Sequence, residues 1–120
     1  MTLLVDTSVW VDHLRRGDEE LARRLLADEV TTHRLVIEEL ACGPMSPRAE
    51  MLDLLEALPR ATEAEHAEFL TFVERWGLAA SGLGAIDVHL LAAAKLSHVR
   101  IWTRDGALAR AAKRLGVGLD

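Results

Sequence analysis

Short continuous apolar runs alternate along this chain with longer stretches in which apolar residues recur at helical spacing. The run at residues 3–5 is typical of a strand buried on both faces of a parallel sheet. Residues 30–32 and 100–103 predict two more strands, and residues 117–119 a short strand at the edge. Strands that alternate with helical segments predict an α/β fold with more helix than strand.

Capping residues and helix breakers delimit the helices expected in the first half of the chain. Thr7 or Ser8 is expected to cap the first helix, which Gly17 ends. The acids at residues 18–20 open the second helix at the positive end of its dipole. A third helix is expected over residues 35–41, before the Gly–Pro pair at 43–44.

The second half of the chain predicts four more helices. Ser46 followed by Pro47 is expected to start a helix that runs to about residue 58, with the proline in its first turn. Residues 62–65 match a capping box that opens a helix ending at Gly77. A loop of small residues at 79–84 leads into a helix that ends near residue 97, and the last helix is expected over 107–115, before Gly116.

Composition limits the possible classes of protein. A chain of 120 residues is expected to form one domain, and its 50% hydrophobic content favours an oligomer or a complex. Acidic residues outnumber basic ones by 19 to 14, which argues against binding nucleic acid by bulk charge. Cys42 is the single cysteine, no signal peptide is recognisable and no apolar stretch is long enough for a bilayer, so we expect a cytoplasmic protein without a membrane partner.

Two of the expected strands end in a carboxylate and a hydroxyl. Asp6 follows the first strand directly, Thr103 ends the strand at 100–103, and Asp105 follows two residues later. Because parallel strands place their carboxyl ends along one crevice, these acids can meet although about a hundred residues separate them. Asp87, at the start of a helix after a glycine-containing loop, is a further candidate, although helix capping explains its position equally well.

A fourth acid is expected from the helix at 35–41, where Glu38 and Glu39 point about 100° apart, so that only one of them can face the crevice. The apolar pattern does not decide between them. Carboxylates gathered without histidine or cysteine favour a hard cation, Mg²⁺ or Mn²⁺, over zinc. This chemistry indicates a metal-dependent phosphodiesterase.

Four segments of the chain share a common pattern with a known family: residues 5–10 (VDTSVW), 39–43 (ELACG), 86–92 (IDVHLLA) and 102–105 (WTRD). Taken in this order, they resemble the PIN-domain ribonucleases, and most closely the VapC-type toxins of toxin–antitoxin pairs. The resemblance implies a three-layer α/β/α sandwich with a mainly parallel central sheet, favours Glu39 over Glu38, and implies a homodimer and a cognate VapB-like antitoxin. It implies that the magnesium-binding acids are Asp6, Glu39, Asp87 and Asp105, supported by the hydroxyls of Ser8 and Thr103.

The resulting hypothesis is a magnesium-dependent endoribonuclease, the toxin of a type II pair, acting on single-stranded or loop RNA. Arg104 is the candidate phosphate contact, while the basic stripe of Arg110, Lys113 and Arg114 is interpreted first as a solvated helix face. Three alternatives remain: a PIN nuclease of RNA processing without an antitoxin, an inactive partner-binding relative, and a receiver-like magnesium-binding module. The receiver needs a lysine at a strand end, and neither Lys95 nor Lys113 is expected at one.

Overall fold

A three-stranded parallel sheet forms the centre of the computed structural model, which describes residues 1–119. Its order is β2-β1-β3, with Leu3 opposite both Val30 and Arg100, and Val5 opposite Trp102. The elements are β1 (Leu3–Val5), α1 (Thr7–Arg16), α2 (Glu19–Leu26), β2 (Val30–Thr31), α3 (Arg34–Ala41), α4 (Arg48–Ala57), α5 (His66–Arg75), α6 (Ala85–Ser97), β3 (Arg100–Trp102) and α7 (Gly106–Arg114).

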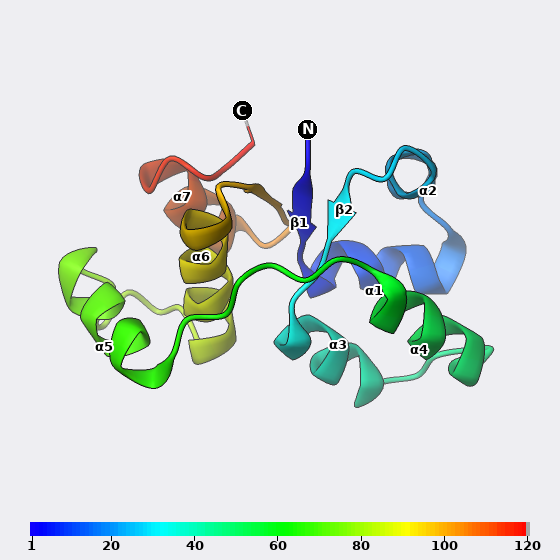
Figure 1. Ribbon diagram of the computed structural model, residues 1–120, viewed down its shortest axis with the longest axis horizontal. Helices are drawn as coiled ribbons and strands as arrows, with labels where there is room; N and C mark the ends of the chain where they lie inside the picture. Colours follow the sequence, from blue (N-terminus) through cyan, green and yellow to red (C-terminus); the bar gives the residue numbers. More distant parts are fainter. Residues whose placement is uncertain (120) are drawn as a thin grey trace.

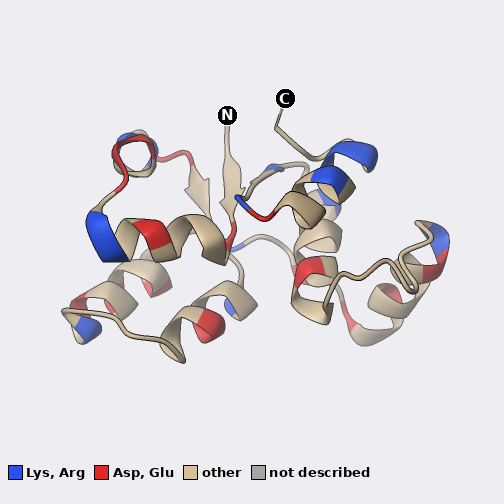
Figure 2. Ribbon diagram, turned by 180° about the vertical axis from the view of Figure 1, so that it is seen from behind, with Lys and Arg blue, Asp and Glu red and all other residues tan. Residues whose placement is uncertain are grey.

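Helices lie on both sides of this sheet, which confirms the expected α/β/α arrangement. Figure 1 shows α1 to α4 on one side of the strands and α5 to α7 on the other, and the view from behind agrees (Figure 2). The strands run in the same direction, so their carboxyl ends meet between the two groups of helices. A crevice at this edge is where an open α/β sheet places its functional residues.

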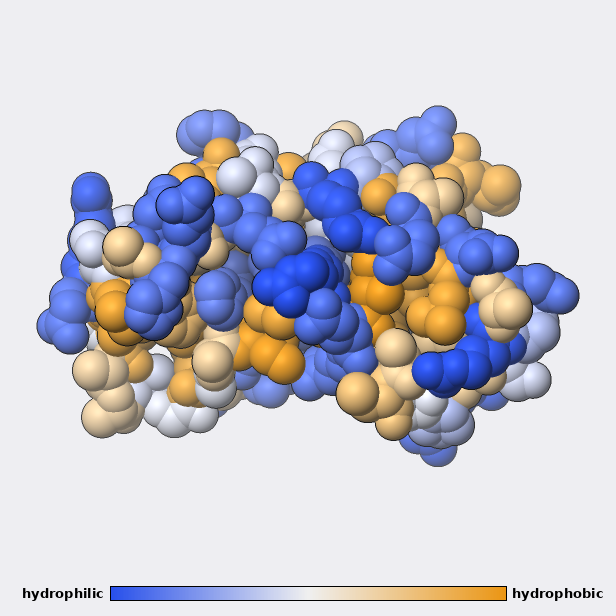
Figure 3. All heavy atoms as spheres, turned by 60° about the horizontal axis from the view of Figure 1, so that its bottom comes forward, coloured by the Kyte–Doolittle hydropathy of each residue, from blue (hydrophilic) through white to orange (hydrophobic). Residues whose placement is uncertain are grey.

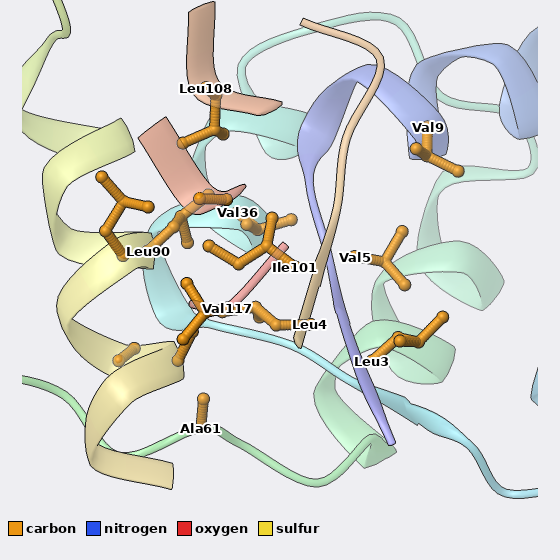
Figure 4. Packing of buried hydrophobic residues seen from close by; sticks show 14 of the residues in the cluster. Leu3, Leu4, Val5, Val9, Val36, Ala61, Leu90, Ile101, Leu108 and Val117 are labelled. Carbon is orange, nitrogen blue, oxygen red and sulfur yellow. The ribbon is translucent and has the colours of Figure 1, made fainter. Parts of the chain in front are cut away.

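The centre of the sheet is buried because its middle strand, β1, is apolar on both faces. Leu4 and Val5 are fully buried, and Ile101 of β3 packs beside them with Leu90 of α6 and Leu108 of α7 (Figure 4). Burial of such side chains stabilises the fold by about 1.5–3 kcal/mol each. The core therefore fixes β1 between its two neighbours, and with it the residues that follow β1.

Two helices begin differently from the sequence expectation. Ser46 does not cap α4, because Pro47 has an extended backbone (φ −72°, ψ 127°) and is itself the residue before the helix. The capping box is formed by Glu65 and Glu68 at the start of α5, and not by Thr62 with Glu65. The chain before α5 is extended because the Ala61 N–H donates to the carbonyl of Thr32, which carries residues 60–61 along the edge of the sheet.

The edges of the sheet are extended by single bridges. Ile101 pairs in parallel with Gly118, so the expected strand over residues 117–119 is reduced to one bridge. The carbonyl of Val117 accepts a hydrogen bond of 2.7 Å from the N–H of Ile101. Within residues 1–119, no helix is both long and apolar enough to cross a membrane.

The burial of β1 predicts a contrast between two leucine-to-alanine variants. Leu4→Ala is expected to lower the free energy of unfolding by about 2–5 kcal/mol, because it leaves a cavity at the centre of the sheet. Leu26→Ala removes the same atoms from a side chain that is 88% exposed and is expected to change stability little. Urea denaturation of both variants measures the difference, and similar losses would contradict the assignment of β1 as the central strand.

Candidate functional site

Asp6 is a buried carboxylate held in place by its position at the end of β1. Its N–H donates to the carbonyl of Trp102 at 2.9 Å, so the pairing of β1 with β3 continues by one residue and sets Asp6 beside Thr103. The residue is 6% exposed. Its Oδ2 accepts hydrogen bonds from the Ser8 N–H at 3.3 Å and from the hydroxyls of Ser8 and Thr103, each at 2.7 Å. These bonds offset the cost of burying the charge.

The two hydroxyls that contact Asp6 are themselves oriented by the backbone. The Arg104 N–H donates to Ser8 Oγ at 2.9 Å, and the Asp105 N–H donates to Thr103 Oγ1 at 3.0 Å. Since each hydroxyl oxygen accepts one of these bonds, its own hydrogen is directed to the Asp6 carboxylate. The loop after β3 is thereby fastened to the start of α1, and Ser8 and Thr103 form the link.

Asp6 also begins α1, a role that the sequence interpretation gave to Thr7 or Ser8. The backbone of Asp6 is extended (φ −71°, ψ 156°), whereas Thr7 already belongs to the helix. The cap therefore falls on the first residue after the strand, because β1 leads into α1 without a loop. Only Oδ2 takes part in this capping, and Oδ1 accepts no side-chain or capping hydrogen bond from the described residues.

Asp105 repeats this arrangement at the start of α7. Its Oδ1 accepts hydrogen bonds from the N–H groups of Ala107 at 2.9 Å and Leu108 at 3.4 Å. Within residues 1–119, Oδ2 accepts none of the hydrogen bonds that cap the helix. Asp6 and Asp105 thus each use one oxygen to begin a helix and keep the other for a further ligand.

Asp87 lies half-buried in the first turn of α6, where the charges of the other acids act on its carboxyl group. Burial raises the pKa of Asp87, and the charges of Asp6, Asp105 and Glu39 raise it further. Like charges act in this way only when they are close and incompletely screened. The structure therefore brings the four acids of the sequence hypothesis into one electrostatic neighbourhood. Red segments at the end of β1, in the β3–α7 loop and on α3 and α6 surround the carboxyl edge of the sheet in Figure 2.

The two glutamates of α3 have different surroundings. Glu38 is in an ion pair with Arg34, whose Nη1 lies 2.9 Å from Oε2, and Arg34 also contacts Glu63. Glu39 borders a groove with Thr7 and Leu40 and is the one of the pair whose charge acts on Asp87. Helical periodicity does not decide between Glu38 and Glu39. Their surroundings in the folded chain favour Glu39 as the acid that faces the crevice.

The donor atoms of this cluster fit a hard divalent cation. All are carboxylate oxygens, which Mg²⁺ and Mn²⁺ prefer, and a cation would relieve the repulsion that raises the pKa of Asp87. Within residues 1–119, no three acidic, histidine or cysteine side chains are grouped tightly enough to enclose a metal ion as they stand. Mutual repulsion of the carboxylates favours such separation, and we take Asp6, Glu39, Asp87 and Asp105 as the candidate ligands.

Arg104 is directed away from the carboxylates of the crevice. Its guanidinium forms ion pairs with Asp12 of α1 and Asp18, the N-cap of α2, and stacks over the ring of Trp102. The structure therefore shows Arg104 fastening the β3–α7 loop to the α1–α2 corner. Sequence reasoning missed Asp12 and Asp18 as its partners, because nothing in their local pattern connects them to a residue about ninety positions away.

Two histidines, His33 before α3 and the half-buried His89 of α6, serve the packing of the fold. His33 is fully buried, and its Nδ1 accepts the N–H of Leu35 at 3.0 Å to cap α3. His89 stacks on Phe69 with ring centroids 4.2 Å apart. Burial lowers the pKa of both rings, so they are neutral at pH 7 and serve packing and capping.

Comparison with known proteins agrees with the resemblance in the four segments. A family model described as PIN domain matches residues 3–114. Ribonuclease VapC32 of Mycobacterium tuberculosis (strain ATCC 25618 / H37Rv) is 46% identical over 118 residues, which cover 98% of this chain and 95% of the relative. The Ribonuclease VapC32 of strain CDC 1551 / Oshkosh has the same identity and coverage.

The raised pKa of Asp87 predicts that removing its charge stabilises the metal-free fold. The folded chain holds this proton at pH values at which the unfolded chain has released it, so the free energy of unfolding falls as the pH rises above 3.8. Asp87→Asn cannot ionise and is expected to raise the Tm by a few degrees near pH 7 and by much less near pH 4. Thermal unfolding in the presence of a chelator measures both values.

Asp53→Asn, at an exposed position of α4, is the matched control and is expected to leave the Tm nearly unchanged. A gain for Asp87→Asn that is equal at both pH values would show that the effect is not electrostatic.

Proposed function

The chain belongs to the PIN-domain family as a ribonuclease of the VapC type, and from this we propose that it is a magnesium-dependent endoribonuclease that hydrolyses phosphodiester bonds of RNA. The observation that carries the proposal is the gathering of carboxylates at the carboxyl ends of the parallel strands: Thr103 joins Asp6 to Asp105, and both acids, with Glu39, lie close enough to the half-buried Asp87 to raise its pKa. Such crowding is costly for stability and is typical of a site where a cation and a substrate bind.

The proposed ligands of Mg²⁺ or Mn²⁺ are Asp6, Glu39, Asp87 and Asp105. When bound, the cation supplies positive charge that offsets that of the phosphodiester and lowers the pKa of water. The protein, for its part, holds the carboxylates of these ligands in place. Asp6 is held through Oδ2 by Ser8, and Asp105 through Oδ1 by the start of α7. The free oxygens of these two carboxylates are thus fixed before any ligand arrives, which reduces the reorganisation that binding requires.

Thr103 is proposed to act as a positioning residue. It joins the two aspartates, because its hydroxyl donates to Asp6 and accepts from the N–H of Asp105. Arg104 supports the same loop through Asp12 and Asp18. We therefore assign these two residues a supporting role, in which they hold the carboxylates that would bind the cation.

We further propose that the protein is the toxin of a type II pair and that a VapB-like antitoxin covers the site. A groove of about 250 Å³ runs beside Glu39, between α1 and the segment that joins α3 to α4. Its walls are mostly apolar, as an interface with a protein segment requires. On the face that Figure 3 shows, hydrophobic residues gather in two areas separated by a hydrophilic band. The groove is lined by Thr7, Val11, Leu14, Arg15, Leu40, Pro44 and Met45 among others.

A homodimer is proposed from the exposure of α5. This helix has no fully buried residue, Leu70 is 51% exposed, and a groove of about 660 Å³ separates the helix from α6. An amphipathic helix that covers so little of its apolar surface is typical of an element that packs against another protein. We also propose a cytoplasmic location, where the substrate RNA would be available.

Asp6→Asn tests the proposed activity. It is expected to lower kcat/KM for Mg²⁺-dependent cleavage of RNA by at least about 100-fold, because even outer-shell changes at metal sites cost 10–100-fold. The measurement is cleavage of labelled RNA by purified protein with Mg²⁺ and with a chelator, with folding checked by circular dichroism. Asp53→Asn serves as the control that changes an exposed carboxylate. Cleavage at the wild-type rate by folded Asp6→Asn protein would contradict the proposal. Undiminished cleavage by the wild-type protein in the presence of the chelator would contradict it as well.

The adjacent glutamates of α3 offer a second, matched test. Glu39→Gln is expected to reduce Mg²⁺-dependent cleavage by at least about tenfold, because it removes a proposed ligand. Glu38→Gln removes the same charge one position away, in an ion pair with Arg34, and is expected to leave cleavage within about twofold. Initial rates at increasing Mg²⁺ concentration separate weaker metal binding from slower chemistry. Equal effects of the two variants would remove the assignment of Glu39.

A further inference from the structure

We infer that the groove between α7 and residues 78–83 binds the phosphodiester backbone of the RNA next to the scissile bond, with Arg110 as its main contact. This inference rests on the proposed ribonuclease function and adds to it the path of the substrate. The groove measures about 240 Å³ and is lined by Leu78, Ser81, Leu83, Ala107, Arg110, Ala111 and Arg114.

The groove is lined by residues that neighbour two of the proposed metal ligands in the sequence. Leu83 precedes Gly84, the N-cap of α6, and Asp87 lies in the first turn of that helix. On the opposite wall, the N–H of Ala107 donates to Asp105. Asp105 thus caps the helix that forms one wall, and Asp87 lies in the helix that follows the other wall, so two of the four proposed metal ligands are within a few residues of the lining of the groove. An RNA strand with one phosphate among the carboxylates can continue into this groove.

Arg110 lies where it can contact an RNA strand in the groove. Its Nη1 would lie 3.2 Å from a Cβ on Gly106, so the guanidinium lies against the residue that follows Asp105. Arg110 is exposed, and no carboxylate among residues 1–119 forms an ion pair with it. By contrast, Arg104 is neutralised by Asp12 and Asp18, and would have to give up those ion pairs to reach a phosphate.

Arg114 extends the basic wall by one helical turn. Residues at i and i+4 are neighbours on a helix face, about 5–6 Å apart at Cβ, so Arg110 and Arg114 lie along one line. The Arg114 guanidinium donates to the carbonyl of Trp76 at 2.9 Å, which holds it at the groove and leaves other donors free. Small side chains at Ala107 and Ala111 leave room for a backbone to approach.

The charge balance of the molecule favours a nucleic acid backbone as the occupant. The chain carries a net charge of −5, and the proposed ligands repel phosphate, so binding needs a local cation beside them. An arginine without an ion-pair partner at the mouth of the site provides one, since guanidinium groups bind phosphate oxygens in a bidentate manner. The contact recognises the backbone and carries no base specificity.

The test compares two charge-removing variants of α7 in the Asp87→Asn background, which is expected to fold without cleaving RNA. Arg110→Gln removes the proposed contact, whereas Lys113→Gln removes one positive charge from an exposed position of the same helix outside the groove. Binding of labelled single-stranded RNAs of several sequences is measured by fluorescence anisotropy at increasing salt. Cleavage kinetics of the same variants in the wild-type background, and binding of the co-expressed antitoxin, are measured in parallel.

Arg110→Gln is expected to weaken binding several-fold for every RNA sequence and to reduce the slope of log K against log salt by about 0.7. It is also expected to raise KM more than it lowers kcat. Lys113→Gln is expected to do neither. Equal effects of both variants, or a loss of antitoxin binding with RNA binding unchanged, would overturn the inference. Wild-type protein that neither binds nor cleaves RNA would refute the proposed function itself, a result distinct from failure of the groove alone.

Discussion

The burial of the Asp6 carboxylate at the end of the central strand is the constraint on which the site depends. A buried charge needs donors, and here Ser8 in the first turn of α1 and Thr103 in the β3–α7 loop supply them, although they are about ninety-five residues apart in sequence. Both hydroxyls are oriented by N–H groups of the β3–α7 loop. The core that fixes β1 beside β3 therefore also fixes the distance between Asp6 and Asp105. The stability of the sheet and the geometry of the site therefore depend on the same contacts.

The same residues show how the fold limits the cost of gathering acids. Asp6 and Asp105 begin helices, so a part of their charge is stabilised by backbone N–H groups whether or not a cation is present. The pKa of Asp87 is raised because its carboxyl is half-buried and because the charges of Asp6, Asp105 and Glu39 act on it. The cluster is therefore a mixture of stabilised and destabilised carboxylates. This division allows the chain to fold with four acids at one edge of a small sheet.

Sequence reasoning succeeded where the signal is local and failed where it is not. The strand at residues 3–5 and the acid that ends it follow from an apolar run, and the α/β order follows from the alternation of patterns. The cap of α1 was wrongly placed because hydroxyl residues also cap helices, and only the backbone of Asp6 shows where the strand ends. The choice between Glu38 and Glu39 depends on Arg34 and on the position of α3 against the sheet, which periodicity does not contain. The ion pairs of Arg104 were missed for the same reason.

The distribution of ion pairs explains how an acidic protein can accommodate an anionic substrate. Arg23, Arg24, Arg34 and Arg60 are bound to glutamates of the surface, so their charges are locally balanced and offer little to a distant phosphate. Arg104 is closer to the site but is balanced by two aspartates of the α1–α2 corner. A long-range attraction cannot arise from such pairs. The proposed function therefore relies on short-range contacts at the crevice, where a cation bound by the carboxylates and the unpaired Arg110 would act together.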